Sequence, residues 1–337
     1  MALPYSRLDV KERARSEWRG GCAVTLPSFS ADFSSLNEAA IAHDVQLAAQ
    51  MGYWGTLVAS ESGTTFEEYK RFLEVAAEAA PDGFRIVAHL SFDTVQQAIE
   101  VAKLGEALGI EAGLLSYPQS FRPKSATEVV EHTRFVTDST DLAIIAFASS
   151  TWGFKPLDTT GFPLEALREI CQAPTVAALK YEGGGSAVMS AFAQVHDLCS
   201  DLALVQNPME QHAPAQSKGF GVKWWGTSGY ASFGSRVPEL FDLLNRGEFS
   251  QAMDVFWSYN PAREAKGAFH ASFAGANLIH RQGWKYLDWL QGFNGGLLRM
   301  PQMRLNPGQM KSLRAGLAAS GFSLPETDDG FYSGRVQ

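Results

Sequence analysis

The sequence predicts an α/β fold in which parallel strands alternate with helices, and three observations support this prediction. Eight short apolar runs are spaced along the first two thirds of the chain. Each run is continuously apolar, which is typical of parallel strands that are buried on both faces. Amphipathic stretches with helical spacing separate the runs. Together these patterns predict a (β/α)8 TIM barrel with an appended C-terminal helical region.

The predicted strands follow one another at even intervals along the chain. They cover residues 21–26, 55–60, 85–90, 113–117, 142–148, 175–181, 202–206 and 221–225. The helices between them are predicted over 38–51, 66–80, 94–108, 126–137, 163–171 and 186–198, and two of these stop at Gly52 and Gly109. A doubly wound sheet or two smaller domains are the alternatives. Neither is favoured, because no Gly-x-Gly-x-x-Gly motif follows the first strand and no flexible linker divides the chain.

The pattern changes after Phe233, where strand signals stop. Helical spacing continues through residues 237–245, 250–269, 276–290 and 307–320. We therefore predict a barrel over residues 1–235, with the active site at the C-terminal ends of its strands, and a C-terminal helical extension over residues 236–337.

The composition excludes several classes of protein. Of the 337 residues, 45% are hydrophobic and 12% are aromatic, which excludes a disordered chain. No apolar run reaches the roughly 18 residues of a membrane span, and a formal net charge of −8 argues against a nucleic-acid partner. Three widely spaced cysteines (Cys22, Cys171 and Cys199) and a charged N-terminal stretch predict a cytoplasmic protein. The sequence contains no metal-binding motif and no nucleophile elbow, so we expect no metal site.

Chemistry in a TIM barrel takes place at the carboxyl ends of the strands. The polar and aromatic residues at the predicted ends are Ser60, Glu61, Ser62, His89, Phe147, Ser149, Lys180, Glu182, Lys223, Trp224 and Trp225. Lys180 stands out because a lysine near the end of a buried strand is costly unless it loses its charge or is paired. A desolvated, neutral amine is the nucleophile of Schiff-base enzymes. The alternative is that Lys180 only pairs with Glu182 or Glu61.

Four segments in order give the chain a family resemblance. They are residues 21–27 (GCAVTLP), 116–123 (SYPQSFRP), 178–183 (ALKYEG) and 298–301 (LRMP). The sequence resembles the dihydrodipicolinate synthase / N-acetylneuraminate lyase family of class I aldolases from about Trp18 to Gly321. The resemblance implies a TIM barrel and a Schiff base at Lys180, with no other cofactor. It also implies a homo-oligomer, either a dimer or a tetramer, and a small-molecule carbonyl substrate.

The sequence departs from the family pattern in the residues that move protons. The resemblance places Ser60, Glu61 and Ser62 at the turn whose threonines bind the substrate carboxylate, so Glu61 replaces a relay threonine. The tyrosine of strand 5 falls at Phe147, which has no hydroxyl group. The third relay tyrosine falls at Ser120, and an arginine that binds a second carboxylate falls at Trp152.

A Schiff-base reaction still needs a group that donates and accepts protons. Glu61 is the first candidate, because a carboxyl group in a partly apolar pocket is suited to acid/base work. Glu182 is the second, since it lies two residues after Lys180 on the same strand face. His89 is the third, although a lone histidine after a strand is more often structural. For Glu61 the alternative role is a salt bridge.

The aromatic residues at the predicted strand ends suggest the character of the substrate. One of the adjacent residues Trp224 and Trp225 faces the barrel, because neighbouring strand residues point to opposite faces. With Trp152 and Phe147 it predicts an apolar wall for a bulky, weakly charged substrate, whereas packing alone is the alternative. Lys223 is expected either to bind an acidic group or to form a surface ion pair.

Three functions follow from these observations. The first is a Schiff-base-forming lyase of the aldolase type that makes or breaks a C–C bond of a 2-oxo acid such as a pyruvate adduct. The second is a dehydratase or deaminase that acts on a 2-oxo-3-deoxy acid. The third is a non-catalytic ligand-binding or regulatory homologue, which the missing tyrosine leaves open.

Overall fold

The computed structural model describes residues 3–274 and 278–336, and it confirms the predicted fold class. Eight strands belong to one parallel sheet, with helices between them, as in a (β/α)8 TIM barrel, and further helices follow the last strand. The strands are β1(Gly20–Thr25), β2(Gly55–Val58), β3(Arg85–Leu90), β4(Ala112–Leu115), β5(Ala143–Ser149), β6(Val176–Glu182), β7(Leu204–Gln206) and β8(Trp224–Gly226). None of the described helices is long and apolar enough to cross a membrane.

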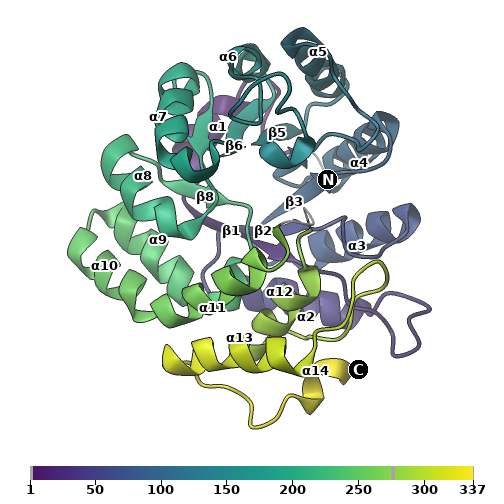
Figure 1. Ribbon diagram of the computed structural model, residues 1–337. Coiled ribbons are helices and arrows are strands. Elements are labelled where there is room, and N and C mark those ends of the chain that lie inside the picture. The colour runs from purple at the N-terminus through teal and green to yellow at the C-terminus, as the bar shows by residue number, and fades with distance from the viewer. Residues whose placement is uncertain (1–2, 275–277, 337) are drawn as a thin grey trace. The chain divides into compact units, whose positions relative to one another are not determined.

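The contacts within the chain divide it into two compact units. The first unit comprises Met1–Arg19 and Arg85–Thr227, and the second comprises Gly20–Phe84 and Ser228–Gln337. In the first unit, β3 to β8 alternate with helices that lie outside the strands (Figure 1). These helices are α4(Val95–Leu108), α5(Ala126–Thr137), α6(Leu164–Gln172), α7(Val188–Cys199) and α8(Ala213–Phe220).

The register between neighbouring strands aligns three side chains of the first unit. Phe147 on β5 pairs with Lys180 on β6, and Lys180 pairs with Gln206 on β7. Because paired residues in a sheet point to the same face, these three side chains form one row across the three strands. Both neighbours of Lys180 on β6, Leu179 and Tyr181, are fully buried.

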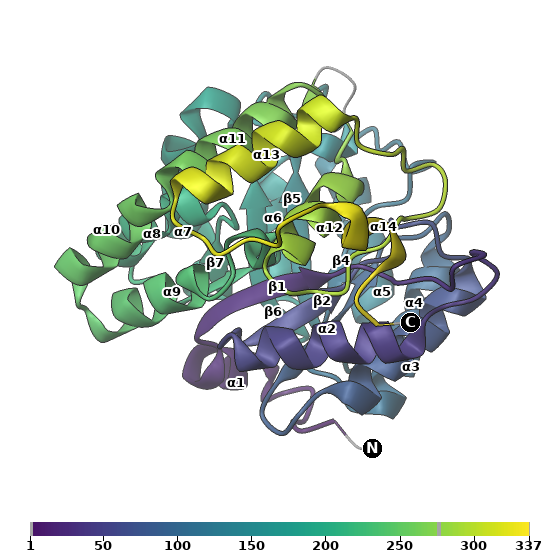
Figure 2. The ribbon, with the colours of Figure 1, turned by 90° about the horizontal axis from the view of Figure 1, so that it is seen from below.

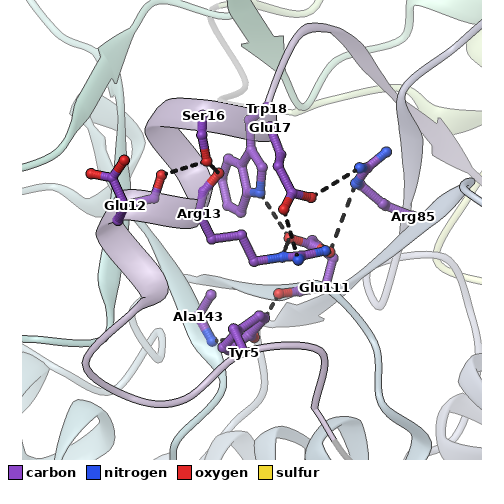
Figure 3. Close-up of polar contacts among 9 residues, drawn as sticks. All are labelled: Tyr5, Glu12, Arg13, Ser16, Glu17, Trp18, Arg85, Glu111 and Ala143. Atoms are coloured by element: carbon purple, nitrogen blue, oxygen red, sulfur yellow. Dashed lines mark hydrogen bonds and ion pairs between the residues drawn. The ribbon is translucent and has the colours of Figure 1, made fainter.

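The N-terminal segment is fastened to the beginnings of three strands of the same unit (Figure 3). The hydroxyl of Tyr5 donates to the carbonyl of Glu111 at 2.7 Å and accepts from the backbone N–H of Ala143 at 2.8 Å. The buried carboxylate of Glu111 also accepts from Arg13 and from the indole of Trp18. Helix α1(Val10–Glu17) is thereby held beside the residues that begin β3, β4 and β5.

The second unit contains β1, β2 and most of the C-terminal half of the chain. Its helices are α2(Glu38–Gln50), α3(Phe66–Ala79), α9(Arg236–Arg246), α10(Phe249–Ser258), α11(Asn260–Ala271), α12(Arg281–Leu290), α13(Pro307–Ala319) and α14(Asp329–Ser333). Helices α11 and α13 lie side by side (Figure 2). Their close approach requires Gly316, because a Cβ atom there would lie 2.4 Å from the Cβ of Ala265.

The predicted helices differ from the observed ones at two places. The stretch 250–269 was expected to form one helix but forms two, α10 and α11. Pro261 lies in the first turn of α11, where a residue without a backbone N–H is tolerated, whereas in a continuous helix it would break the ladder of hydrogen bonds. The predicted helix 276–290 is observed from Arg281, and residues 276–277 lie outside the described residues.

Helix α12 is unusual because all ten of its residues are buried although several are charged. The ammonium group of Lys285 donates to the carbonyl of Pro27 and, at 3.1 Å, to the hydroxyl of Ser28. Asp288 accepts from the hydroxyl of Ser232 at 3.0 Å, and that hydroxyl accepts from Lys266 at 3.1 Å. Burial lowers the pKa of Lys285 to about 8 and raises the pKa of Asp288 to about 7.

We expect Asp288 to make a contribution to stability that falls as pH rises between about 4 and 7, and Asp288→Asn to lack this contribution. Burial raises the pKa of Asp288 from 3.8 to about 7, so the folded chain keeps a proton that the unfolded chain has released. The contribution of Asp288 to stability therefore decreases with pH across this window. Urea unfolding at several pH values measures the effect, with Asp254→Asn on the exposed side of α10 as the control. Equal slopes in wild type and Asp288→Asn would contradict the assignment.

Candidate active site

Lys180 lies near the carboxyl end of β6 and is buried, with 5% of its surface exposed. Its Nζ donates to the carbonyl oxygen of Thr227 at 2.9 Å and lies 3.4 Å from the Thr227 hydroxyl. The carboxylate of Glu182 lies 3.2 Å from the same nitrogen. The amine is therefore held in one position by groups from two strand ends of the first unit.

The aromatic ring of Phe147 forms another side of this amine site. Lys180 Nζ lies 4.0 Å from the centre of the ring, which is the geometry of a cation–π contact. Trp152 packs edge-to-face against Phe147 at 5.2 Å, and its indole N–H donates to the Phe147 carbonyl at 2.8 Å. The structure thus puts beside the lysine an apolar ring that has no hydroxyl group of its own to accept or donate a proton.

The ion pair and the ring both stabilise the charged form of the lysine, whereas burial opposes it. An amine that is to attack a carbonyl group must first give up a proton. Of the side chains described around Lys180, the carboxylate of Glu182 is the one shown in ion-pair contact with Nζ. Glu182 therefore has the geometry of a proton acceptor for Lys180.

Two residues near the lysine were missed by the sequence analysis, namely Thr227 and Gln206. Thr227 follows β8, and Gln206 is the last residue of β7. The side-chain amide of Gln206 donates to the carbonyl of Gly226, while its buried Oε1 has no partner among the described residues. Gln206 could have been found from the sequence, because it is a polar residue at the end of an apolar run. The same feature identified Lys180.

Ser60, Glu61 and Ser62 lie together in the second unit, directly after β2. Glu61 forms an ion pair with Arg281 of α12, with 3.0 Å between Oε2 and Nη2. Ser62 is buried, and its hydroxyl has no hydrogen-bond partner among the residues that the structure describes.

The loop after β2 also contacts the motif at residues 298–301, which contains Arg299. A Cβ atom at Gly63, whose φ is +85°, would lie 2.8 Å from the Cβ of Arg299. Arg299 also binds the carboxylate of Glu68 at 2.7 Å and 2.8 Å. The motif at residues 298–301 therefore shapes the loop that follows β2, although more than 200 residues separate the two in the sequence.

The remaining predicted residues lie elsewhere in the first unit. His89 is buried and its Nε2 lies 3.1 Å from the hydroxyl of Ser116. Ser149 is buried and accepts from the backbone N–H of Thr151, whereas Ser120 is exposed on the loop after β4. The described contacts of His89 and Ser149 are therefore with residues other than Lys180.

The predicted strand at residues 221–225 is displaced, since β8 begins at Trp224. Lys223 is exposed and precedes β8, so it lies at the amino end of the strand and not at its carboxyl end. Trp224 packs against Trp18, with 4.9 Å between ring centres. Trp225 is fully buried beside it. The prediction was wrong about this strand's limits because the buried, apolar Val222 lies before the strand and extends the apolar run beyond it.

No group of three or more His, Cys, Asp or Glu residues that could hold a metal ion occurs within residues 3–274 and 278–336. The three cysteines are buried and unlinked.

No protein-family model matches the chain, but it is similar in sequence to several synthases, lyases and dehydratases. The 4-hydroxy-tetrahydrodipicolinate synthase of Mycolicibacterium gilvum is 25% identical over 82% of this chain and 88% of its own length. The N-acetylneuraminate lyase of Escherichia fergusonii is 25% identical over 70% and 77%, respectively. A probable 5-dehydro-4-deoxyglucarate dehydratase of Acinetobacter baumannii is 24% identical over 85% and 90%.

Solved structures of proteins with similar names share the fold of this chain. The dihydrodipicolinate synthase of Cyanidioschyzon merolae superposes with a TM-score of 0.75 at 17% identity, covering 91% of this chain and 99% of that one. The N-acetylneuraminate lyase of Proteus mirabilis gives a TM-score of 0.73 at 19% identity, covering 90% and 99%. The chain is therefore a homologue of the dihydrodipicolinate synthase and N-acetylneuraminate lyase family, and a lyase of the class I aldolase type.

Proposed function

We propose that this protein condenses Lys180 with the carbonyl group of a 2-oxo acid and then makes or breaks a C–C bond of the resulting imine. The observation that carries the proposal is the buried amine at the carboxyl end of β6, 3.2 Å from the carboxylate of Glu182. A fixed amine with a proton acceptor in contact is the arrangement that nucleophilic catalysis by lysine requires.

The first steps can be written with groups of the first unit. Glu182 takes a proton from the Lys180 ammonium, and the free amine attacks the carbonyl carbon. One of the two protons on the attacking nitrogen moves to the carbonyl oxygen, which gives a neutral carbinolamine. Glu182 then returns its proton to the new hydroxyl group, which leaves as water and gives the protonated imine. The imine itself withdraws electrons from the neighbouring C–C bond, so the proposed reaction needs no further cofactor.

The later proton transfer differs from the family pattern, because Phe147 has no hydroxyl group. We assign this transfer to Glu61 after β2 and the earlier one to Glu182. Glu61 forms an ion pair with Arg281, and its carboxylate is a group of the kind that can accept a proton in the C–C bond step. Ser62 is proposed to bind the substrate carboxylate with its unpartnered hydroxyl.

The substrate is proposed to carry an apolar body beyond its 2-oxo acid group. The ring of Phe147 contacts the lysine and Trp152 packs against that ring. Trp152 stands where the resemblance expects a carboxylate-binding arginine. An indole cannot bind a carboxylate as a guanidinium does. A second carboxylate on the substrate is therefore not expected at this position.

A dehydratase is the second candidate, favoured by the relative that is named a probable 5-dehydro-4-deoxyglucarate dehydratase. Its reaction uses the same imine, but the bond that breaks joins carbon to oxygen. Analysis of the products separates the two candidates. An aldehyde is released together with pyruvate in the first case, and water is lost from the substrate in the second.

We expect borohydride to trap pyruvate on Lys180. Reduction of the imine gives a stable secondary amine, seen as a mass increase on the intact chain and located on the peptide that contains Lys180. Lys180→Met should abolish the adduct, while Lys103→Met on the exposed face of α4 should retain it. An adduct on another buried lysine, such as Lys285 or Lys266, would overturn the assignment, and no adduct with any 2-oxo acid would favour a non-catalytic homologue.

A further inference from the structure

A cavity lies in the first unit, at the end of the strands opposite to Lys180. It has a volume of about 260 Å³ and is formed by the loops that lead into β7 and β8 together with the end of α1. Lys180 is near the carboxyl end of β6, whereas Leu204 and Trp224, which line the cavity, are the first residues of β7 and β8. The cavity is therefore separate from the proposed imine site.

The polar lining of this cavity is cationic. Arg15, Arg19 and Lys223 all line it, and no aspartate or glutamate does. Within residues 3–274 and 278–336, none of these three cations forms an ion pair with a carboxylate. The whole chain has a net charge of −8, whereas this cavity is lined by three cations that form no described ion pair. The cavity therefore has the opposite charge to the chain as a whole.

Backbone contacts hold the two guanidinium groups in place without cancelling their charge. Arg19 donates to the carbonyl oxygens of Trp18 at 2.6 Å and of Arg15 at 2.7 Å. Arg15 donates to the carbonyl of Asp201 at 2.5 Å. The carboxylate of Asp201 itself binds Arg168 through two hydrogen bonds. A guanidinium group has five N–H donors, so each arginine retains donors for a ligand.

Aromatic side chains form the apolar walls of the cavity. The rings of Trp18 and Trp224 lie 4.9 Å apart, and those of His196 and Phe220 lie 5.1 Å apart. The indole of Trp18 is fixed by its hydrogen bond to the buried carboxylate of Glu111 (Figure 3). Burial lowers the pKa of His196, so this imidazole is neutral near pH 7 and adds no charge.

We propose that this cavity binds a small organic anion with a planar apolar body, such as an aromatic carboxylate. The cations recognise the carboxylate group, and the aromatic walls contact the ring. The volume is close to the lower limit of about 300 Å³ for ligand pockets, so the ligand contains about one ring. The site does not depend on the proposed reaction at Lys180.

Calorimetric titration with benzoate at low salt tests the proposal. Wild type and Lys180→Met should both bind one benzoate with the same affinity, and added salt should weaken binding. The double variant Arg19→Gln/Lys223→Gln should bind about tenfold or more weakly, because it loses two charged donors. Lys103→Gln on α4 is the matched control and should bind as wild type does.

Several outcomes would overturn the proposal. They are a lack of benzoate binding, unchanged binding by the double variant, and loss of binding in Lys180→Met, which would place benzoate at the imine site. Inorganic phosphate, which has charge but no ring, should bind more weakly, and equal binding would contradict the role of the aromatic walls. If the Arg19 substitution unfolds the chain, the single variant Lys223→Gln replaces the double variant in this test and should also bind benzoate more weakly. Lys223 is exposed, so its substitution removes one charge and no buried contact.

Discussion

Replacing Glu182 by glutamine should reduce the rate of imine formation and of turnover by about 10²- to 10⁴-fold. Glutamine keeps the shape of the side chain, but its amide cannot take the proton of the Lys180 ammonium 3.2 Å away. The variant also cannot return a proton to the hydroxyl group of the carbinolamine, so both proton transfers of imine formation lose their carboxylate. Single-turnover borohydride trapping with pyruvate measures the rate of adduct formation, and steady-state assays measure kcat.

Glu61→Gln is the matched comparison for this experiment. Glu61 pairs with Arg281 and is assigned to the later C–C bond step, so its variant should form the adduct at the normal rate and yet lose turnover. The two carboxylates are thus distinguished by which step each variant slows. Normal trapping rates in Glu182→Gln would remove that residue from the first step, and normal turnover in Glu61→Gln would remove Glu61 from the second.

Lys285→Met should lower the free energy of unfolding by about 3–5 kcal/mol, the cost of breaking a buried charged network. The substitution keeps an unbranched chain of similar volume but removes the ammonium group that interacts with the buried Asp44. It also leaves the buried carbonyl of Pro27 without its described donor. Because α12 is buried over its whole length, water cannot replace these contacts readily.

Chemical denaturation followed by fluorescence measures this loss, with Lys311→Met on the exposed side of α13 as the control. The control removes a lysine from a solvated surface and should change stability by less than about 0.5 kcal/mol. A similar small change in Lys285→Met would show that the network contributes little, and that α12 is held by its aromatic packing instead.

The sequence by itself determined the fold class and the catalytic lysine of the proposal. Continuous apolar runs report burial on both faces, and this local signal is enough to identify parallel strands and the helices between them. The spacing of Lys180 and Glu182 is also a local property, because residues two apart on a strand share a face. Their contact at 3.2 Å follows from that spacing.

Only the tertiary structure decided which distant residues meet. The pairing of Glu61 with Arg281 joins positions 220 residues apart, and nothing in either segment identifies its partner. Lys223 and Trp224 were predicted near the carboxyl end of a strand, yet β8 begins at Trp224. Lys223 therefore lies at the amino end of β8, where it lines the same cavity as Arg15 and Arg19. The physical reason is that side-chain periodicity records burial but not register or strand limits. Those depend on contacts between segments that the chain brings together only when it folds.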